Sequence, residues 1–504
     1  MISRTKLASA LAVSVVTLIG VGSETAAAAD CSGSSRILGR GASFANLAHN
    51  DLTNGWIVNA GCQVGSKDAT FAGGDDLVFY EGLGSGAGLT AFGGGNATPG
   101  VRDQTVAFVG TDDAPSPAQL ANMNEGSNPS SVNPDGDDGK LHQIPVAQGA
   151  TAFIVNAPTT CKAGASGNAQ GRPKLPVGVA GDTNQIVEKV FSGEATTWGA
   201  LGLVNKVGGA PCSVAIKRVV RQDNSGTTFQ FKKFLESTDQ GATTAWSSID
   251  EVSENNTIWP DPSAPNPVAP GAAKDSDGTC DGIVSGTPLT GNWVCTATAS
   301  GNGNLSTLVA NTPGAVGYSD LATARSRGFD LNGSASTDAT WWFPLYSPSS
   351  TSIVFDPTSQ SNGYKTGITT AQKGARCANA KYGINGGTAL PANLTVDWST
   401  TVQQQTGSVY PACVVTFMAA WEDYEDVYPT VNCADLKARQ ADVADYIQYI
   451  LGIAPIGTGA NEGQTLLPTA DYSPLSVPLR NKANLYLAQA AFDETPDRNP
   501  IRTC

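Results

Sequence analysis

The sequence predicts an α/β fold with mixed or parallel sheets flanked by helices, and two patterns carry this prediction. Short β-rich runs alternate with segments of helical periodicity, which favours strands joined by crossover helices. The clearest helix is expected at residues 434–451, where apolar residues recur on one face and Gly452 stands at the stop position. The β-rich runs lie at residues 106–109, 144–155, 214–220 and 414–417.

Three stretches rich in Pro, Gly, Ser, Asn and Asp are predicted to be loops or insertions. They lie at residues 122–140, 260–282 and 325–408. These stretches account for much of the extra length of a chain whose 504 residues are too many for one ordinary domain.

The composition is typical of an exported protein. Charged residues make up 15% of the chain, against roughly 25% in average soluble proteins. The net charge is −14, so no long-range positive field exists to attract nucleic acid or an anionic membrane. Any anionic ligand must therefore be held by local chemistry, and we expect no nucleic-acid partner.

The N-terminus has the pattern of a signal peptide, predicted at residues 1–29. Arg4 and Lys6 precede an apolar run at residues 7–22, and small residues at 26–29 suit a signal peptidase. The apolar run is shorter than the roughly 20 residues that cross a bilayer. We therefore expect an exported chain that is soluble after cleavage before Asp30, in a periplasm or in the medium.

The cysteines predict disulfides, because their number is even and all follow the predicted cleavage site. No CxxC or CxxH pair occurs, so we expect no zinc site and no other metal. Spacing leaves the connectivity open; pairing in sequence order is the arrangement that closes only local loops. In that order the pairs are Cys31 with Cys62, Cys161 with Cys212, Cys280 with Cys295, Cys377 with Cys413, and Cys433 with Cys504.

Two glycine-rich segments could bring backbone amides to an oxyanion. Residues 39–44 (GRGASF) place Ser43 before a helical pattern, as an N-cap whose helix start attracts anions. Residues 82–88 (GLGSGAG) follow a strand-like run, and Ser85 adds a hydroxyl donor.

Two further segments follow predicted strands. In residues 110–115 (GTDDAP), a carboxylate stands at a strand's carboxyl end, where α/β sheets place ligands. In residues 221–229 (RQDNSGTTF), Arg221 offers a planar fork to an oxyanion, Asp223 can orient it, and a helix start supplies hydroxyl and amide donors.

In this order, the segments resemble the phosphate-binding, substrate-capture component of bacterial ABC phosphate transporters. The resemblance includes residues 80–86 (YEGLGSG), the D-A-P at Asp113, the R-x-D-x-S-G-T at Arg221 and residues 311–318 (NTPGAVGY). It covers about the whole mature chain apart from the insertions. The insertions, the ten cysteines and the lack of a lipid anchor depart from the family's usual pattern.

The resemblance implies a two-lobed, type II periplasmic-binding-protein fold that encloses inorganic phosphate. Lobe I would comprise residues 30–142 and 409–504, and lobe II residues 143–408, with insertions at about 260–294 and 325–408. Asp223 would stand behind the Arg221 guanidinium. The phosphate-binding residues carried over are Ser43, Phe44, Ser85, Asp113, Arg221, Ser225, Gly226 and Thr227.

The expected function is delivery of phosphate to an ABC permease by a monomer without a cofactor. Asp113 would accept the proton that phosphate keeps near neutral pH and that sulfate lacks. A secreted scavenger, or a structural or adhesin-like protein that reuses the fold without a permease, is the first alternative. A secreted phosphatase or esterase is the second, and a Ser-His-Asp triad would have to use His49 or His142, the only histidines.

Overall fold

The computed structural model describes the greater part of the chain between residues 36 and 486. The described residues are 36–49, 52, 77–95, 101–124, 140–163, 185–221, 223–239, 293–296, 301–329, 340–347, 350–358, 374–422, 424, 427–428, 433–452 and 463–486. The predicted signal peptide, residues 1–29, lies outside them.

A nine-stranded sheet forms the centre of the described structure. Its strand order is β2-β1-β3-β15-β4-β9-β7-β8, and β10 also pairs with β4. The bounds are β1 Arg36–Gly41, β2 Leu77–Glu81, β3 Val106–Thr111, β4 Leu141–Asn156, β7 Lys217–Val220, β8 Trp293–Cys295, β9 Ala315–Asp320, β10 Thr340–Phe343 and β15 Cys413–Trp421.

The sheet is mixed, and β4 joins its two halves. The first ten residues of β4 pair antiparallel with β15, whereas residues 151–156 pair antiparallel with β9. On one side, β1 pairs in parallel with β2 and β3; on the other, β7 pairs in parallel with β8 and β9. All sixteen residues of β4 are buried, so this strand runs through the core.

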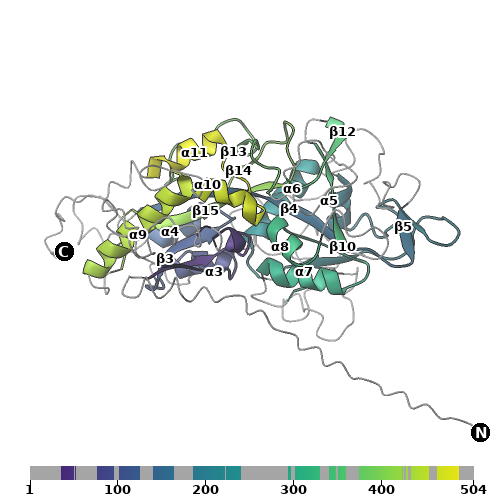
Figure 1. The fold of residues 1–504 in the computed structure, drawn as a ribbon, viewed down its shortest axis with the longest axis horizontal. Helices are drawn as coiled ribbons and strands as arrows, with labels where there is room; N and C mark the ends of the chain where they lie inside the picture. The colour runs from purple at the N-terminus through teal and green to yellow at the C-terminus, as the bar shows by residue number, and fades with distance from the viewer. Residues whose placement is uncertain are drawn as a thin grey trace, which may run out of the picture.

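Helices cover both halves. Figure 1 shows α3, α4 and α9 toward one end of the molecule and α5, α6, α7 and α8 around the other half of β4. The bounds are α3 Ser85–Ala91, α4 Pro117–Asn124, α5 Gln185–Ser192, α6 Gly226–Thr238, α7 Gly301–Asn311, α8 Leu321–Ser326, α9 Cys433–Leu451, α10 Gly463–Leu466, the 3-10 helix η3 Leu467–Ala470, and α11 Val477–Ala483.

The predicted α/β class is confirmed, and so are the strands expected at residues 106–109 and 144–155 and the helix expected at 434–451, which is α9. Residues 325–408 were expected to be loops or an insertion; the loop is wrong for the described part of this stretch, whereas the insertion stays a prediction. This stretch contains β10, the hairpin of β11 Leu345–Ser347 and β12 Ser350–Phe355, and the pair β13 Tyr382–Ile384 and β14 Thr401–Gln403.

The physical reason is aromatic burial. In β10, Trp342 and Phe343 are fully buried and the strand pairs with the end of β4. The indole nitrogen of Trp342 donates to Asp356 Oδ2 at 2.9 Å. In the predicted loop at 122–140, residues 122–124 complete α4, while 125–139 lie outside the described residues, as does all of 260–282.

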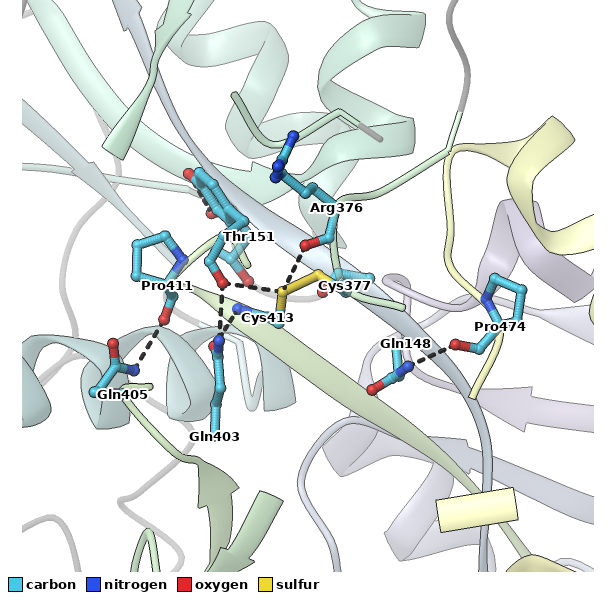
Figure 2. Close-up of a disulfide and its surroundings, with 11 residues drawn as sticks. Gln148, Thr151, Arg376, Cys377, Gln403, Gln405, Pro411, Cys413 and Pro474 are labelled. Carbon is cyan, nitrogen blue, oxygen red and sulfur yellow. Dashed lines mark hydrogen bonds between the residues drawn. A yellow bond between two sulfur atoms is a disulfide. The ribbon is translucent and has the colours of Figure 1, made fainter. Parts of the chain in front are cut away.

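Two disulfides confirm two of the pairs expected from sequence order, Cys161–Cys212 and Cys377–Cys413. Cys161 opens β5 Cys161–Ala163, which pairs with β6 Leu203–Asn205. Figure 2 shows Cys377 bonded to Cys413 at the start of β15, where the Cys413 amide donates to the Gln403 side chain at 2.7 Å. The other six cysteines lie outside the residues whose side chains are described: Cys31, Cys62, Cys280, Cys295, Cys433 and Cys504.

None of the helices in the described ranges is long and apolar enough to span a bilayer. Within the same ranges, no cluster of His, Cys, Asp and Glu side chains has the arrangement of a metal site.

Candidate anion-binding site

The loops after the four strands β1, β2, β3 and β7 meet beside the ends of β1 and β3. The amide of Ala42 donates to Gly110 O at 2.7 Å, the amide of Gly84 to Gly41 O at 2.7 Å, and the amide of Gly86 to Asn224 O at 3.2 Å. Gly84 has φ +106, and a Cβ there would lie 3.2 Å from Asn224 O. Glycine at position 84 therefore permits the loop after β2 to approach the loop after β7.

Arg221 lies at the centre of these loops and is 1% exposed. Its Nε donates to Asp223 Oδ1 at 2.9 Å, and its Nη2 donates to Asp223 Oδ2, so the two side chains form a bidentate ion pair. Its Nη1 donates to Ser43 Oγ at 3.2 Å and to Asn302 Oδ1 at 2.8 Å. Asp223 thus holds the guanidinium in one orientation.

Ser43 faces Arg221 and α7. Its Oγ accepts from the Arg221 guanidinium and also from the backbone N–H of Asn302, at 3.2 Å in each case. The neighbouring Phe44 is fully buried, and its carbonyl accepts a hydrogen bond from the Tyr472 hydroxyl. Ser43 therefore joins the end of β1 to residues more than 170 positions away in sequence.

The helix start expected after Arg221 is present. Ser225 is the N-cap of α6, and its Oγ accepts from the Thr228 amide at 3.1 Å. The first amides of a helix, here those of Gly226 and Thr227, have no partner within the helix and suit an anion. A Cβ on Gly226 would lie 2.5 Å from Ser85 Oγ and 2.6 Å from the Asp113 amide, so α6 begins in close contact with the loops after β2 and β3.

Asp112, which the sequence analysis did not select, contacts these groups directly. Its amide donates to Ser85 Oγ at 3.2 Å, and its Oδ2 accepts from Thr227 Oγ1 at 3.2 Å. Its carbonyl accepts from Gln230 Nε2 at 2.8 Å. Asp112 is 1% exposed, and burial, together with the Asp320 carboxylate nearby, raises its pKa to about 7, while Arg221 and neighbouring hydroxyls oppose the rise.

Asp113 has different neighbours. Its amide donates to Thr111 Oγ1 at 3.1 Å, and its carbonyl accepts from the same hydroxyl. Burial raises the pKa of its carboxyl to about 7, and the Asp112 carboxylate adds to the rise. Lys232 and Lys233 lower it. The cations that act on Asp113 are thus these two lysines of α6, whereas Arg221 acts on Asp112.

Asn302, at the start of α7, is the second contact residue that sequence reasoning missed. It is fully buried, and its Nδ2 donates to Thr227 Oγ1 at 3.1 Å and to Asp320 Oδ2 at 2.8 Å. Asp320 ends β9 and caps α8 by accepting from the Thr323 amide at 2.7 Å. The Gly-Asn repeat at 301–304 gives no periodic or charge signal that distinguishes this asparagine.

The two histidines lie among other partners. His49 Nδ1 is 3.0 Å from the Tyr446 hydroxyl, and its ring stacks on Tyr80. Burial lowers the pKa of His49 to about 3. His142 Nε2 is 3.1 Å from Glu422 Oε2.

Several solved structures resemble the fold. The structure of PfluDING, a high-affinity periplasmic phosphate-binding protein, aligns with a TM-score of 0.48 and 17% identity, covering 90% of this chain and 93% of that one. A phosphate-binding protein from Stenotrophomonas maltophilia aligns with a TM-score of 0.47 and 18% identity, covering 89% of this chain and 92% of that one.

A human phosphate-binding apolipoprotein aligns with a TM-score of 0.47 and 16% identity, covering 89% of this chain and 93% of that one. No curated protein matches the sequence. A family model described as the PBP superfamily domain matches residues 66–365, more than half of the 504 residues. The chain therefore belongs to the PBP superfamily.

Proposed function

We propose that this protein is an exported binding protein for inorganic phosphate, which it encloses between two lobes and delivers to an ABC permease. One observation carries the proposal: Arg221 and Thr227, both from the segment at residues 221–229, lie in one largely buried hydrogen-bonded group with Ser43 and Asn302, which come from two other parts of the chain. A cation with a planar fork, hydroxyls and helix-start amides is the donor set that a tetrahedral oxyanion requires.

The lobes proposed are residues 30–142 with 409–504, and residues 143–408. In this division Ser43, Ser85 and Asp112 belong to lobe I, and Arg221 and Thr227 to lobe II. The hydrogen bonds from Arg221 to Ser43 and from Thr227 to Asp112 then join the two lobes. Closure of the lobes would therefore bring the residues that bind the anion together. Phosphate would meet Arg221, the hydroxyls of Ser43, Ser85, Ser225 and Thr227, and the amides of Phe44, Gly226 and Thr227, with Asp223 behind the guanidinium.

The proton of the bound phosphate needs an acceptor. The resemblance assigns this role to Asp113, but the contacts favour its neighbour, because Asp112 Oδ2 touches Thr227 and its amide touches Ser85. We therefore propose Asp112 as the acceptor, with Asp113 beside it. Sulfate has no proton at neutral pH, so its oxygen would face the buried carboxylate without a bridging hydrogen, which disfavours it.

Binding without catalysis is part of the proposal. The hydrogen bonds described for His49 and His142 go to Tyr446 and Glu422, which does not favour a triad with a serine of the site. Secretion as a free phosphate scavenger is the second candidate function. The disulfides Cys161–Cys212 and Cys377–Cys413 favour it, because disulfides persist in oxidising, extracellular surroundings.

The binding proposal is tested by equilibrium dialysis of radiolabelled phosphate with the wild-type chain, Arg221→Lys and a control, Arg327→Lys. Lysine keeps the charge at position 221 but cannot form the fork to Asp223. We expect phosphate affinity to fall about 10- to 100-fold, since hydrogen bonds to charged groups contribute about 1.5–3 kcal/mol each. Arg327 is exposed on the turn after α8, so its variant should bind as the wild type does.

Equal affinities for all three proteins would contradict the assignment of the site. The transport step is tested separately, by cross-linking in phosphate-starved cells. Recovery of this protein with a permease supports delivery, whereas recovery from culture fluid alone supports the scavenger.

A further inference from the structure

We infer that Asn302 is a positioning residue that fixes the direction in which the Thr227 hydroxyl donates its proton, and thereby makes Thr227 a donor toward the bound anion. The inference rests on the proposed phosphate site. It assigns a role to Asn302 of α7, a residue that none of the sequence motifs includes.

The orientation of the Asn302 amide is determined by two neighbours. Arg221 can only donate, and its Nη1 lies 2.8 Å from Asn302 Oδ1. The carboxylate of Asp320, on the other side, accepts, and its Oδ2 lies 2.8 Å from Asn302 Nδ2. A flipped amide would place a donor against a donor and an acceptor against an acceptor, so only one orientation satisfies both neighbours.

In this orientation Nδ2 has one remaining hydrogen, and it points to Thr227 Oγ1 at 3.1 Å. The Thr227 oxygen therefore accepts from Asn302. A hydroxyl has a single proton, which must then point elsewhere, and the structure places Asp112 Oδ2 in that direction at 3.2 Å. This is also the side on which phosphate would lie.

The side chains that form these hydrogen bonds are buried, which makes the direction of each bond important. Asn302 and Thr227 are fully buried, and Asp320 is 1% exposed. Water cannot readily substitute for a missing or reversed hydrogen bond at such positions. The backbone N–H of Asn302 also donates to Ser43 Oγ at 3.2 Å, so the same residue contacts a second hydroxyl of the site.

The variant that tests the direction is Asn302→Asp, which keeps the shape but replaces the donor by an acceptor. At pH 8 its carboxylate would accept the Thr227 proton, lie against Asp320 and compete with phosphate for Arg221. We expect phosphate affinity to fall at least about 100-fold at pH 8. At pH 5, where the new carboxyl regains a proton, we expect at least about 10-fold of the lost affinity to return relative to the wild type.

Two other variants complete the experiment, each measured by calorimetric titration with phosphate at both pH values. Asn302→Ala removes the amide without adding an acceptor, and should weaken binding about 10-fold with the pH profile of the wild type. Asn304→Asp makes the same chemical change at an exposed position on the same helix, and should leave the affinity within about 2-fold.

Asn302→Asp and Asn302→Ala with equal affinities and parallel pH profiles would overturn the inference, because a merely structural role predicts that result. Thr227→Val serves if Asn302→Asp fails to fold: it removes the hydroxyl itself, so an unchanged phosphate affinity in this variant would also overturn the inference. Absence of phosphate binding by the wild type would instead overturn the proposed function, and the inference with it.

Discussion

The buried Asp112 carboxyl should make the unliganded protein lose stability as pH rises. Its pKa in the folded chain is raised from 3.8 to about 7, chiefly by burial. A raised pKa means that the folded state holds the proton more tightly than the unfolded chain, so the stabilisation is complete below about pH 4 and is lost as pH rises to about 7. Replacement by asparagine removes this titration while keeping the shape of the side chain.

The size of this loss of stability follows from the pKa of Asp112 in the folded chain. Between pH 5 and pH 8 the unfolded carboxyl is ionised throughout, whereas the folded one loses its proton at about pH 7. Two pH units at 1.36 kcal/mol each give a loss of about 3 kcal/mol. Asp112→Asn should therefore lack this loss, so that the free energy of unfolding of the variant, relative to that of the wild type, increases by about 3 kcal/mol between pH 5 and pH 8.

Urea denaturation of phosphate-stripped protein at the two pH values measures this difference. Asp113→Asn should also reduce the pH dependence, because burial raises the pKa of that carboxyl to about 7 as well. The exposed Glu194 on the turn after α5 provides the control, Glu194→Gln. If Asp112→Asn showed the same change between pH 5 and pH 8 as the wild type, the buried, neutral carboxyl would be refuted.

Two further predictions concern close packing and cross-linking. Gly226→Ala should weaken phosphate binding more than about 10-fold in titration calorimetry, because its methyl group would lie 2.6 Å from the Asp113 amide. Gly303→Ala is the control: its methyl group would contact only the end of the Arg327 side chain, so this variant should bind phosphate as the wild type does. Removal of the Cys377–Cys413 disulfide by a double alanine substitution should lower the free energy of unfolding by about 4 kcal/mol, from the entropy of a loop closed over a separation of 36 residues. A loss below about 1 kcal/mol in urea denaturation would contradict that expectation.

Much of the site could be predicted because its residues follow strands. Ser43 and Asp112 follow β1 and β3, which are parallel neighbours, and the carboxyl ends of parallel strands lie at one edge of a sheet. Arg221 follows β7, which runs in the opposite direction to β1 and β3, and the carboxyl ends of the two halves face each other near the middle of β4. The motifs therefore marked loops that the fold brings together, although the strand between β3 and β4 is β15, from the far end of the chain.

Other features depend on tertiary contacts that local patterns do not encode. Adjacent residues Asp112 and Asp113 are alike in sequence, and only packing against α6 separates their neighbours. Asn302 is one asparagine among several, and its contacts come from residues 75 to 259 positions away as well as from Asp320. β10 lies in a stretch rich in Ser and Asp, and its pairing with β4 spans nearly 200 positions.

In the proposed function, the hydrogen-bonded group around Arg221 binds phosphate and rejects sulfate. The most direct test is calorimetric titration of the oxidised chain, refolded after removal of any bound ligand, first with phosphate and then with sulfate at pH 8. We predict tight, one-to-one binding of phosphate and no heat above dilution with sulfate. Equal binding of the two anions, or binding of neither, would contradict the account.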